Sequence, residues 1–229
     1  MTLHRFFVEP GAMVGERFPV PAAIDQQVRR VLRLADGDRI VLLPNDGTAA
    51  LCRLEDGDCV VEERSPVGSE PRHRLTVVQA LLKGDALEEV VQHATELGVA
   101  AFRLVVTERC IAREISPRKI ERLRTIAREA AEQSERGIIP TVADPVSLAD
   151  VVDEGSVLLY ERHEGSRLAR MDPPATMIIG PEGGFTRAEV EAATRAGAGV
   201  AGLGPRILRA ETVAVAAAAV VLSRTGDFA

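Results

Sequence analysis

The sequence predicts an α/β protein with a parallel sheet, preceded by a small β-rich domain. From residue 75 onward, apolar runs of strand length alternate with amphipathic helical patterns, an order typical of a parallel α/β domain. Residues 1–64 instead carry short β-type runs separated by Asn-Asp-Gly and Glu-Asp-Gly turn signals. Residues 65–72 hold two prolines and a glycine, so we expect a linker there. The chain is therefore expected to have two domains, residues 1–70 and 73–229.

The first domain is expected to be a small β-barrel, interrupted by a short helix near residues 25–34. Phe6 and Phe7 could stack on bases, although burial in the barrel core is expected for at least one of them. The helix carries clustered arginines, which on spacing alone form a solvated helical face. A surface for RNA phosphates is the alternative, because the planar guanidinium suits phosphate contacts. These arginines are Arg29, Arg30 and Arg33.

The second domain is expected to alternate strands and helices in a regular order. Asp85 is expected to cap the first helix, and Gly98 ends it. Ser116-Pro117 opens a second, long helix with one apolar face, and Gly137 ends that helix. The expected strands comprise residues 75–82, 102–106, 157–160, 177–179 and 200–203.

The last two of these strands both end in Gly-Pro turns. One turn is Gly180-Pro181 and the other is Gly204-Pro205, and proline cannot extend a strand ladder. The helix that joins these two strands begins with a capping box at Thr186. Because such a crossover makes the strands parallel, both turns are expected at the same edge of one sheet. That edge is where open α/β sheets bind ligands.

The composition limits the function classes. No N-terminal segment has the layout of a signal peptide, and the longest apolar run, residues 213–222, is about half of what a membrane span needs. We therefore expect a cytoplasmic protein. The cysteines and histidines lack ligand spacing, so no metal is expected. A net charge of −6 argues against a surface that binds nucleic acid throughout, which leaves a local basic patch.

Two long motifs follow one another around the Gly-Pro turns. They read Ile-Gly-Pro-Glu-Gly-Gly-Phe at residues 179–185 and Leu-Gly-Pro-Arg-Ile-Leu-Arg-Ala-Glu-Thr at residues 203–212. Together they closely resemble the RsmE family, the 16S ribosomal RNA uridine N3-methyltransferases of the SPOUT superfamily. The chain departs from that family at Gln27, where a histidine is expected. The likeness also includes segments 5–7, 30–33, 83–85, 94–99, 107–109 and 129–136.

The resemblance implies a fold and an assembly. The fold is α/β, with a SPOUT-type parallel sheet, a C-terminal trefoil knot and a PUA-like β-barrel domain in front of it. Physical reasoning alone argues against a knot, since true knots are very rare in folds. The implied assembly is a homodimer. The helix near residues 212–223 fits this expectation, because it is almost wholly apolar and needs cover on every side.

The resemblance also implies S-adenosylmethionine as the cofactor. Methyl transfer is an in-line displacement from an activated sulfonium, so the protein mainly holds two reactants in line. Glycine-rich turns suit this task because their backbone groups can approach an adenine edge closely. The alternative is that these glycines only make tight turns. The residues assigned to the cofactor are Ile179, Gly180, Glu182, Gly183, Leu203, Gly204, Ile207 and Leu208.

The implied acceptor, N3 of uridine, must lose its proton. A base, or a cation that stabilises the uridinate, is therefore needed. We assign this chemistry to Arg209, Glu211 and Arg136, the last from either subunit. For Glu132 and Arg136 the alternative is an exposed ion pair that contributes about 0.3–0.5 kcal/mol. The residues expected to bind 16S ribosomal RNA or the small ribosomal subunit are Arg5, Arg29, Arg30, Arg33, Glu132 and Gln133.

Two other functions stay open. The first is another SPOUT RNA methyltransferase, acting on a ribose 2′-hydroxyl or on transfer RNA. Such relatives usually carry an asparagine near the start of the fold, which this sequence lacks. The second is a non-catalytic RNA-binding or assembly factor, in which the glycine turns no longer bind a cofactor. Cofactor binding distinguishes the second from both enzymes.

Overall fold

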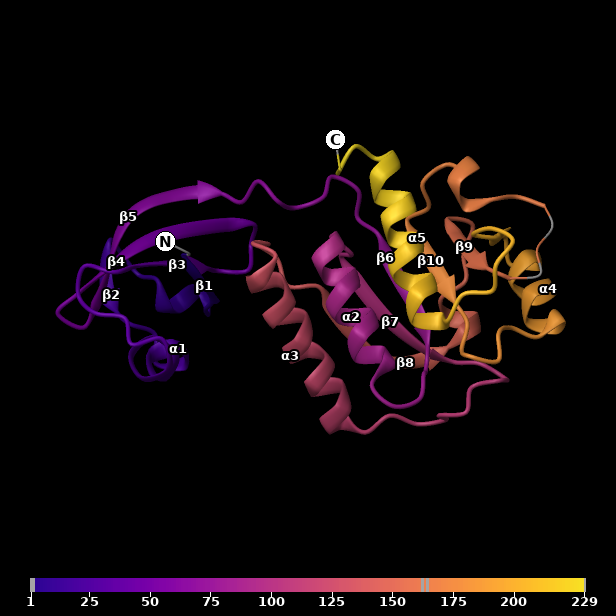
Figure 1. Ribbon diagram of the computed structural model, residues 1–229, viewed down its shortest axis with the longest axis horizontal. Coiled ribbons are helices and arrows are strands. Elements are labelled where there is room, and N and C mark those ends of the chain that lie inside the picture. The colour runs from indigo at the N-terminus through magenta and orange to yellow at the C-terminus, as the bar shows by residue number, and fades with distance from the viewer. Residues whose placement is uncertain (1–2, 162, 164, 229) are drawn as a thin grey trace. The chain divides into compact units, whose positions relative to one another are not determined.

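The computed structural model describes residues 3–161, 163 and 165–228 (Figure 1). The chain forms two compact units. The first unit comprises Met1–Glu70 and Ala131–Ile139, and the second comprises Pro71–Ala130 and Pro140–Ala229. The long helix α3 (Pro117–Gln133) begins in the second unit, and its last residues belong to the first.

A mixed sheet forms the first unit. Among the described residues its strand order is β1-β3-β4-β5-β2, with β1 parallel to β3 and the other neighbours antiparallel. Side chains alternate between the faces of a strand, so Phe6 enters one apolar cluster and Phe7 another. Both are buried, so the suggestion that they stack on bases is wrong. The elements are β1 (His4–Phe7), η1 (Pro10–Ala12), β2 (Arg17–Pro19), β3 (Arg39–Leu43), β4 (Thr48–Glu55) and β5 (Asp58–Pro66).

The short helix predicted in this unit differs from its expected range. It begins as α1 (Ala22–Gln26) and continues as the π-helical segment η2 (Gln27–Val31). Arg29 and Arg30 lie on η2, whereas Arg33 lies beyond it with a φ of 56°. All three side chains are exposed, but only two of them share one helical segment.

Glu70 joins the segment Ala131–Ile139 to the rest of the first unit. Its carboxylate accepts hydrogen bonds from the backbone amides of Gly137 at 2.9 Å and Ile138 at 3.0 Å. It also pairs with the guanidinium of Arg136 at 3.0 Å. The segment expected to be a linker is thus partly ordered, since its first residues extend β5 and Glu70 is anchored.

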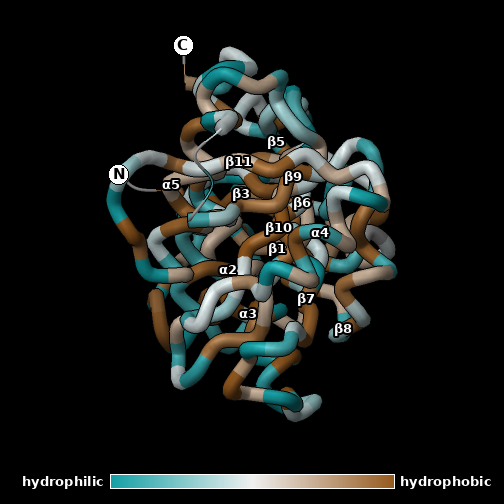
Figure 2. The backbone as a smooth tube through the Cα atoms, turned by 90° about the vertical axis from the view of Figure 1, so that its right-hand side faces the viewer, coloured by the Kyte–Doolittle hydropathy of each residue, from teal (hydrophilic) through white to brown (hydrophobic). Residues whose placement is uncertain are grey.

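A parallel sheet forms the second unit, as predicted. Its order among the described residues is β11-β9-β10-β6-β7-β8, and each pairing is parallel. The middle strands are buried, and Figure 2 shows hydrophobic residues along β9 and β10. The sequence did not predict β8, an edge strand that contains a proline and several exposed residues. The strands are β6 (Thr76–Ala80), β7 (Ala101–Val106), β8 (Thr141–Ser147), β9 (Ser156–Leu159), β10 (Thr176–Ile179) and β11 (Gly199–Ala201).

The helices of this unit begin and end mostly where the sequence indicates. Gly98, in the left-handed conformation with a φ of 108°, ends α2. Asp85 precedes α2 but its side chain makes no capping hydrogen bond, so the predicted cap is wrong. The capping box of α4 is confirmed, because Thr186 and Glu189 each accept the other's backbone N–H. These elements are α2 (Ala86–Leu97), η3 (Leu148–Asp150), η4 (Leu168–Arg170), α4 (Arg187–Arg195) and α5 (Ala210–Arg224).

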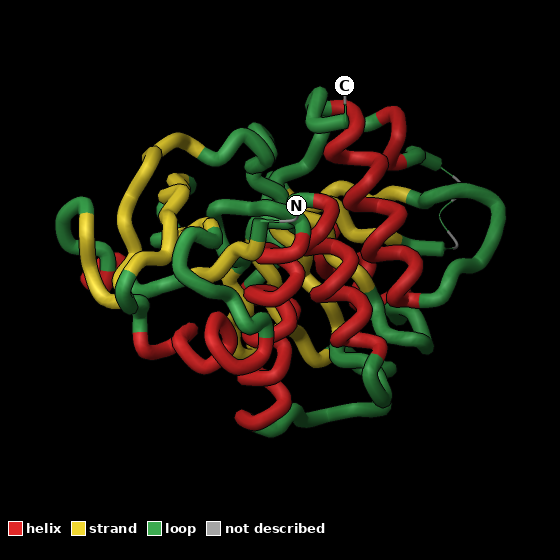
Figure 3. The backbone as a smooth tube through the Cα atoms, turned by 60° about the vertical axis from the view of Figure 1, so that its left-hand side comes forward, coloured by secondary structure: helices red, strands yellow, loops and turns green. Residues whose placement is uncertain are grey.

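Helix α5 packs against α2 on one face of the sheet (Figures 1 and 3). Its buried positions form one stripe, and Ala217 and Ala218 in that stripe are fully buried within the chain's own fold. The chain's own fold therefore covers this stripe, and a partner subunit is not needed to bury it. The opposite stripe is apolar and partly exposed, and it consists of Val215, Ala216, Ala219 and Val220.

Two features are absent from the part of the chain that the structure describes. None of the helices found there combines the length and apolar character that a membrane crossing requires. Nor does this part of the chain hold a group of at least three His, Cys, Asp or Glu side chains that could bind a metal ion.

Candidate functional site

Three strand ends meet at one edge of the parallel sheet. β9 pairs with β10 on one side and with β11 on the other. The Gly-Pro turns that follow β10 and β11 therefore flank the residues that follow β9. Tyr160 continues the pairing beyond β9, since its backbone amide donates to the carbonyl of Ala201 at 2.9 Å.

A cavity of about 660 Å³ lies between these strand ends, and we refer to it as the edge cavity. Its size falls within the range of small-molecule sites, about 300–1,000 Å³. Both Gly-Pro turns contribute to its wall. The lining includes all the residues assigned to a cofactor from the sequence, namely Ile179, Gly180, Glu182, Gly183, Leu203, Gly204, Ile207 and Leu208.

The start of α5 forms another part of the wall. Arg209 is the residue before this helix and is exposed, and Glu211 lies in the first helical turn and is partly buried. Both line the edge cavity. A cationic and an anionic side chain thus stand beside the two turns, at a helix N-terminus whose free amides favour negative charge.

The sequence did not indicate several residues of this wall. Tyr160 and Glu161, which follow β9, line the edge cavity, and so does Arg206 in the second turn. A Cβ atom added to Gly184 would lie 3.0 Å from Oε1 of Glu161, so the two segments are in close contact. The predicted strand at residues 157–160 placed its end at the same edge as the turns, but only the strand order, with β9 between β10 and β11, brings that end to the cavity.

Hydrogen bonds from neighbouring loops hold the first turn in place. The guanidinium of Arg109 donates to the carbonyls of Gly183 at 3.1 Å and Phe185 at 3.2 Å. The backbone amide of Lys83 donates to the carboxylate of Glu182 at 2.9 Å. Arg109 and Lys83 come from two short motifs noted in the sequence, which therefore support the turn from the ends of β7 and β6.

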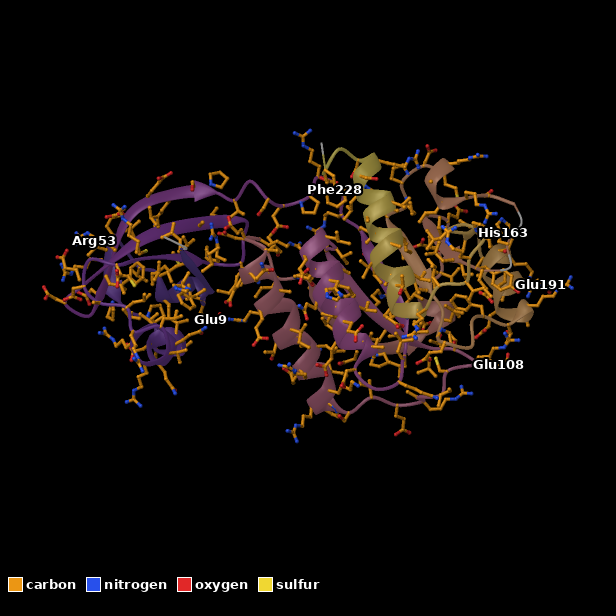
Figure 4. All side chains as sticks on the ribbon, viewed as in Figure 1. Glu9, Arg53, Glu108, His163, Glu191 and Phe228 are labelled. Atoms are coloured by element: carbon orange, nitrogen blue, oxygen red, sulfur yellow. The ribbon has the colours of Figure 1, made fainter. Side chains whose placement is uncertain are left out.

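The loop that carries Arg109 is also tied to α4. The amide of Glu108 donates to Oε1 of Glu189 at 2.8 Å, so one carboxylate serves both the capping box and this loop. Figure 4 labels Glu108 near α4, and it labels His163 in the loop after β9. The ring of His163 accepts a hydrogen bond from the amide of Ser166 at 2.9 Å.

The second turn is held through its backbone as well. Arg167 donates to the carbonyl of Gly204 at 3.2 Å. Gly204 has a φ of 151°, and a Cβ atom added to it would meet no protein atom within 4 Å. The side of Gly204 that a Cβ would occupy thus faces open space, and its backbone has a conformation that favours glycine.

The other residues predicted for the site belong to the first unit, whereas the edge cavity lies in the second. The side chain of Arg136 is 3% exposed and pairs with Glu70. Glu132 accepts a hydrogen bond from the amide of Phe7 at 2.9 Å, and Arg5 pairs with Glu135 at 2.7 Å. These contacts give the three residues structural partners, and their roles in catalysis or RNA binding stay predictions.

Comparisons with known proteins show which family this chain belongs to. The family model described as an RNA methyltransferase domain matches residues 69–222. Ribosomal RNA small subunit methyltransferase E of Bacillus subtilis is 31% identical over 97% of this chain and 97% of its own length. The chain belongs to the ribosomal RNA small subunit methyltransferase E family.

Other members of the methyltransferase E family support the same placement. The protein of that name from Rickettsia conorii is 35% identical, with 96% of each chain covered. The crystal structure of the Neisseria gonorrhoeae protein, bound to S-adenosyl methionine, matches with a TM-score of 0.87 and 28% identity. It covers 97% of this chain and 98% of the other. The α/β fold with a SPOUT-type parallel sheet and a separate mixed sheet is thereby confirmed, while the knot stays a prediction.

Because Arg109 donates hydrogen bonds to the first turn, we expect its replacement to speed amide exchange there. Arg109→Met removes a charged donor from two carbonyls, and such bonds contribute about 1.5–3 kcal/mol each. We expect the Gly184 amide, which donates to the carbonyl of Pro181 at 2.9 Å, to exchange at least about tenfold faster. Hydrogen-exchange mass spectrometry over residues 180–186 measures this.

A matched control is Arg187→Met, which removes an arginine whose ion pair with Glu191 is largely exposed. This variant should leave exchange in the turn as it is in the unmodified protein. Equal exchange in the Arg109 and Arg187 variants would show that Arg109 does not hold the turn.

Proposed function

We propose that this protein transfers the methyl group of S-adenosylmethionine to N3 of a uridine in 16S ribosomal RNA of the small ribosomal subunit. The observation that carries the proposal is the edge cavity, whose wall contains both Gly-Pro turns together with Arg209 and Glu211. The family relatives support it, since they are named for methylation of small-subunit ribosomal RNA. A protein with this activity works in the cytoplasm, where ribosomes are assembled.

The residues of the edge cavity fit S-adenosylmethionine. The open space in front of Gly204 lets the backbone of the second turn approach a flat adenine closely. Ile207 is 83% exposed, which is unusual for a large apolar side chain, and with Leu208 it can cover apolar faces of the cofactor. When bound, the cofactor supplies an activated methyl sulfonium, so the chain needs to position reactants more than to activate them.

Arg209 and Glu211 are the proposed groups for the acceptor proton. The N3–H of uracil is a weak acid, so a carboxylate that accepts its proton lowers the barrier. A guanidinium next to the uracil carbonyls stabilises the negative charge that develops on the ring. We assign the first role to Glu211 and the second to Arg209. Arg136 is proposed as a further contributor from either subunit.

The first unit is the proposed contact for the rest of the RNA. Arg29 already pairs with Asp25 at 2.6 Å, so its charge is partly neutralised. Arg30 and Arg33 are exposed and are therefore the stronger candidates for phosphate contacts. The remaining proposed RNA-binding residues are Arg5, Arg29, Glu132 and Gln133.

We further propose that the protein is a homodimer that uses the exposed stripe of α5. This stripe, Val215, Ala216, Ala219 and Val220, leaves apolar surface accessible along a helix whose other face is buried. Small residues let two helices approach closely, and burying the stripe in a second subunit removes it from water. The same helix begins at Arg209 and Glu211, so the interface would also fix the catalytic side chains.

The activity is tested by nucleoside mass spectrometry. Small subunits and free 16S RNA from a bacterial strain without this enzyme are incubated with the protein and S-adenosylmethionine. We expect one added methyl group, recovered as 3-methyluridine. A 2′-O-methylated nucleoside, or methylation of added transfer RNA instead, would indicate the other class of SPOUT enzyme. Binding of RNA without cofactor binding or methyl transfer would indicate an assembly factor.

Gly204→Val tests the assignment of the cofactor to the edge cavity. The added side chain enters the open space in the cavity, and its branched Cβ disfavours a φ of 151°. We expect the affinity for S-adenosylmethionine, measured by calorimetry, to fall at least about 100-fold, equivalent to about 2.7 kcal/mol. Circular dichroism should show an intact fold. An unchanged affinity would contradict the assignment.

Ala216→Glu tests the dimer. A carboxylate buried without a partner costs several kcal/mol, so this variant should sediment as a monomer and lose methyl transfer. Ala192→Glu is the matched control, because Ala192 is exposed on α4. That control should behave as the unmodified protein does. A folded monomer of the Ala216 variant with full activity would show that the dimer is dispensable, and a variant that stays dimeric would show that the stripe is not the interface.

A further inference from the structure

A second cavity, of about 330 Å³, lies at the carboxyl end of β6. Its walls are mostly apolar and come from the end of β6, the start of α2 and the loop after β7, including Leu82, Leu87, Ile111 and Ile115. Ile111 is 61% exposed, so a large apolar side chain faces solvent at this cavity. An exposed apolar wall around a concave space is typical of a site that binds a partly apolar ligand.

Both lysines of the chain lie at this cavity. The sequence contains lysine only at positions 83 and 119, and both residues line the cavity, which we therefore refer to as the lysine cavity. The ammonium of Lys119 donates to the carbonyl of Gly84. Lys83 is exposed, and within the described residues it forms no ion pair. Glu114 supplies a carboxylate to the same lining, so the cavity has two cations and one anion.

The lysine cavity and the edge cavity share one segment of chain. Ala86 lines the edge cavity, whereas Lys83, Gly84 and Leu87 line the lysine cavity. The amide of Lys83 also bonds to Glu182, a residue of the edge cavity. A ligand that extends from one cavity to the other would therefore cross only a few residues at the start of α2.

Methyl transfer to N3 of a uridine requires a particular conformation of the RNA around the reacting base. N3 lies on the pairing edge of the base, so the base must leave its pair and its stack before it can react. The neighbouring nucleotide then loses one stacking partner and exposes an apolar face. A nearby apolar slot with cations at its rim would stabilise that neighbour by covering the base and contacting its phosphate.

We propose that the lysine cavity binds the nucleotide next to the methylated uridine. Ile111 and Ile115 cover the base, Lys83 and Lys119 contact the phosphate, and Glu114 offers an acceptor to an exocyclic amino group. This inference rests on the proposed function, because it assigns a second part of the same RNA substrate. The cavity thereby fixes how the RNA enters the edge cavity.

The test uses steady-state methylation of small ribosomal subunits, with the full-length protein in each case. Ile111→Ser removes apolar cover, and Lys83→Gln removes a cation without disturbing the backbone bond to Glu182. We expect each variant to raise KM for the subunit about tenfold and to change kcat by less than about twofold. For Lys83→Gln, the log–log slope of RNA binding against salt should also fall by about 0.7. Calorimetry should give an unchanged Kd for S-adenosylmethionine.

Matched controls keep the proposal falsifiable. Ile111→Leu retains the apolar wall and should keep the KM of the unmodified protein. Arg118→Gln removes one positive charge from α3 outside the lysine cavity and should leave KM and the salt slope unchanged. Unchanged KM in both Ile111→Ser and Lys83→Gln would overturn the proposal, as would equal effects of Lys83→Gln and Arg118→Gln. If the unmodified protein methylates no RNA, the proposed function itself fails.

Discussion

The parallel pairing of β9 with β10 on one side and β11 on the other is the constraint on which the site depends. Parallel strands end at the same edge, so this pairing brings two turns that are 24 residues apart in sequence to one cavity. Neither turn could enclose a ligand alone. The register of three short strands therefore determines the distance between the backbone of Gly180 and that of Gly204.

The glycine-rich turns are unlike ordinary flexible loops because charged side chains fix their carbonyls. Arg109 holds the first turn at Gly183 and Phe185, and Arg167 holds the second at Gly204. A turn that is already in its binding conformation loses little conformational entropy when a ligand arrives. The surrounding arginines thus act by positioning backbone, and the direct contacts to a ligand are left to the turns.

The sequence predicts the local features of this molecule well. The Gly-Pro turns and the capping box at Thr186 depend on backbone preferences of neighbouring residues, and every residue that the motifs assigned to the cofactor lines the edge cavity. The sequence did not predict that Tyr160 and Glu161 line the edge cavity. Their position there depends on the order of strands in the sheet, which no local pattern encodes.

The difference between local sequence preferences and contacts between distant segments also explains the predictions that failed. Helix α5 is almost wholly apolar, so its sequence could not show that Ala217 and Ala218 are buried while Ala216 is partly exposed. Phe6 and Phe7 enter two different apolar clusters, and the burial of both depends on what packs on each face of β1, which the local sequence does not encode. One contact was not predicted at all, namely that of Arg136 with Glu70, because it joins residues 66 positions apart and such ion pairs leave no local sequence signal.

The proposed function requires that one cavity, built by two turns, binds the cofactor. The most direct measurement is a crystal structure of the protein grown with S-adenosylmethionine. We expect electron density for the cofactor in the edge cavity, with its adenine against the backbone of both turns and its methyl group directed toward Arg209 and Glu211. Cofactor bound elsewhere in the second unit, with the edge cavity empty, would contradict it.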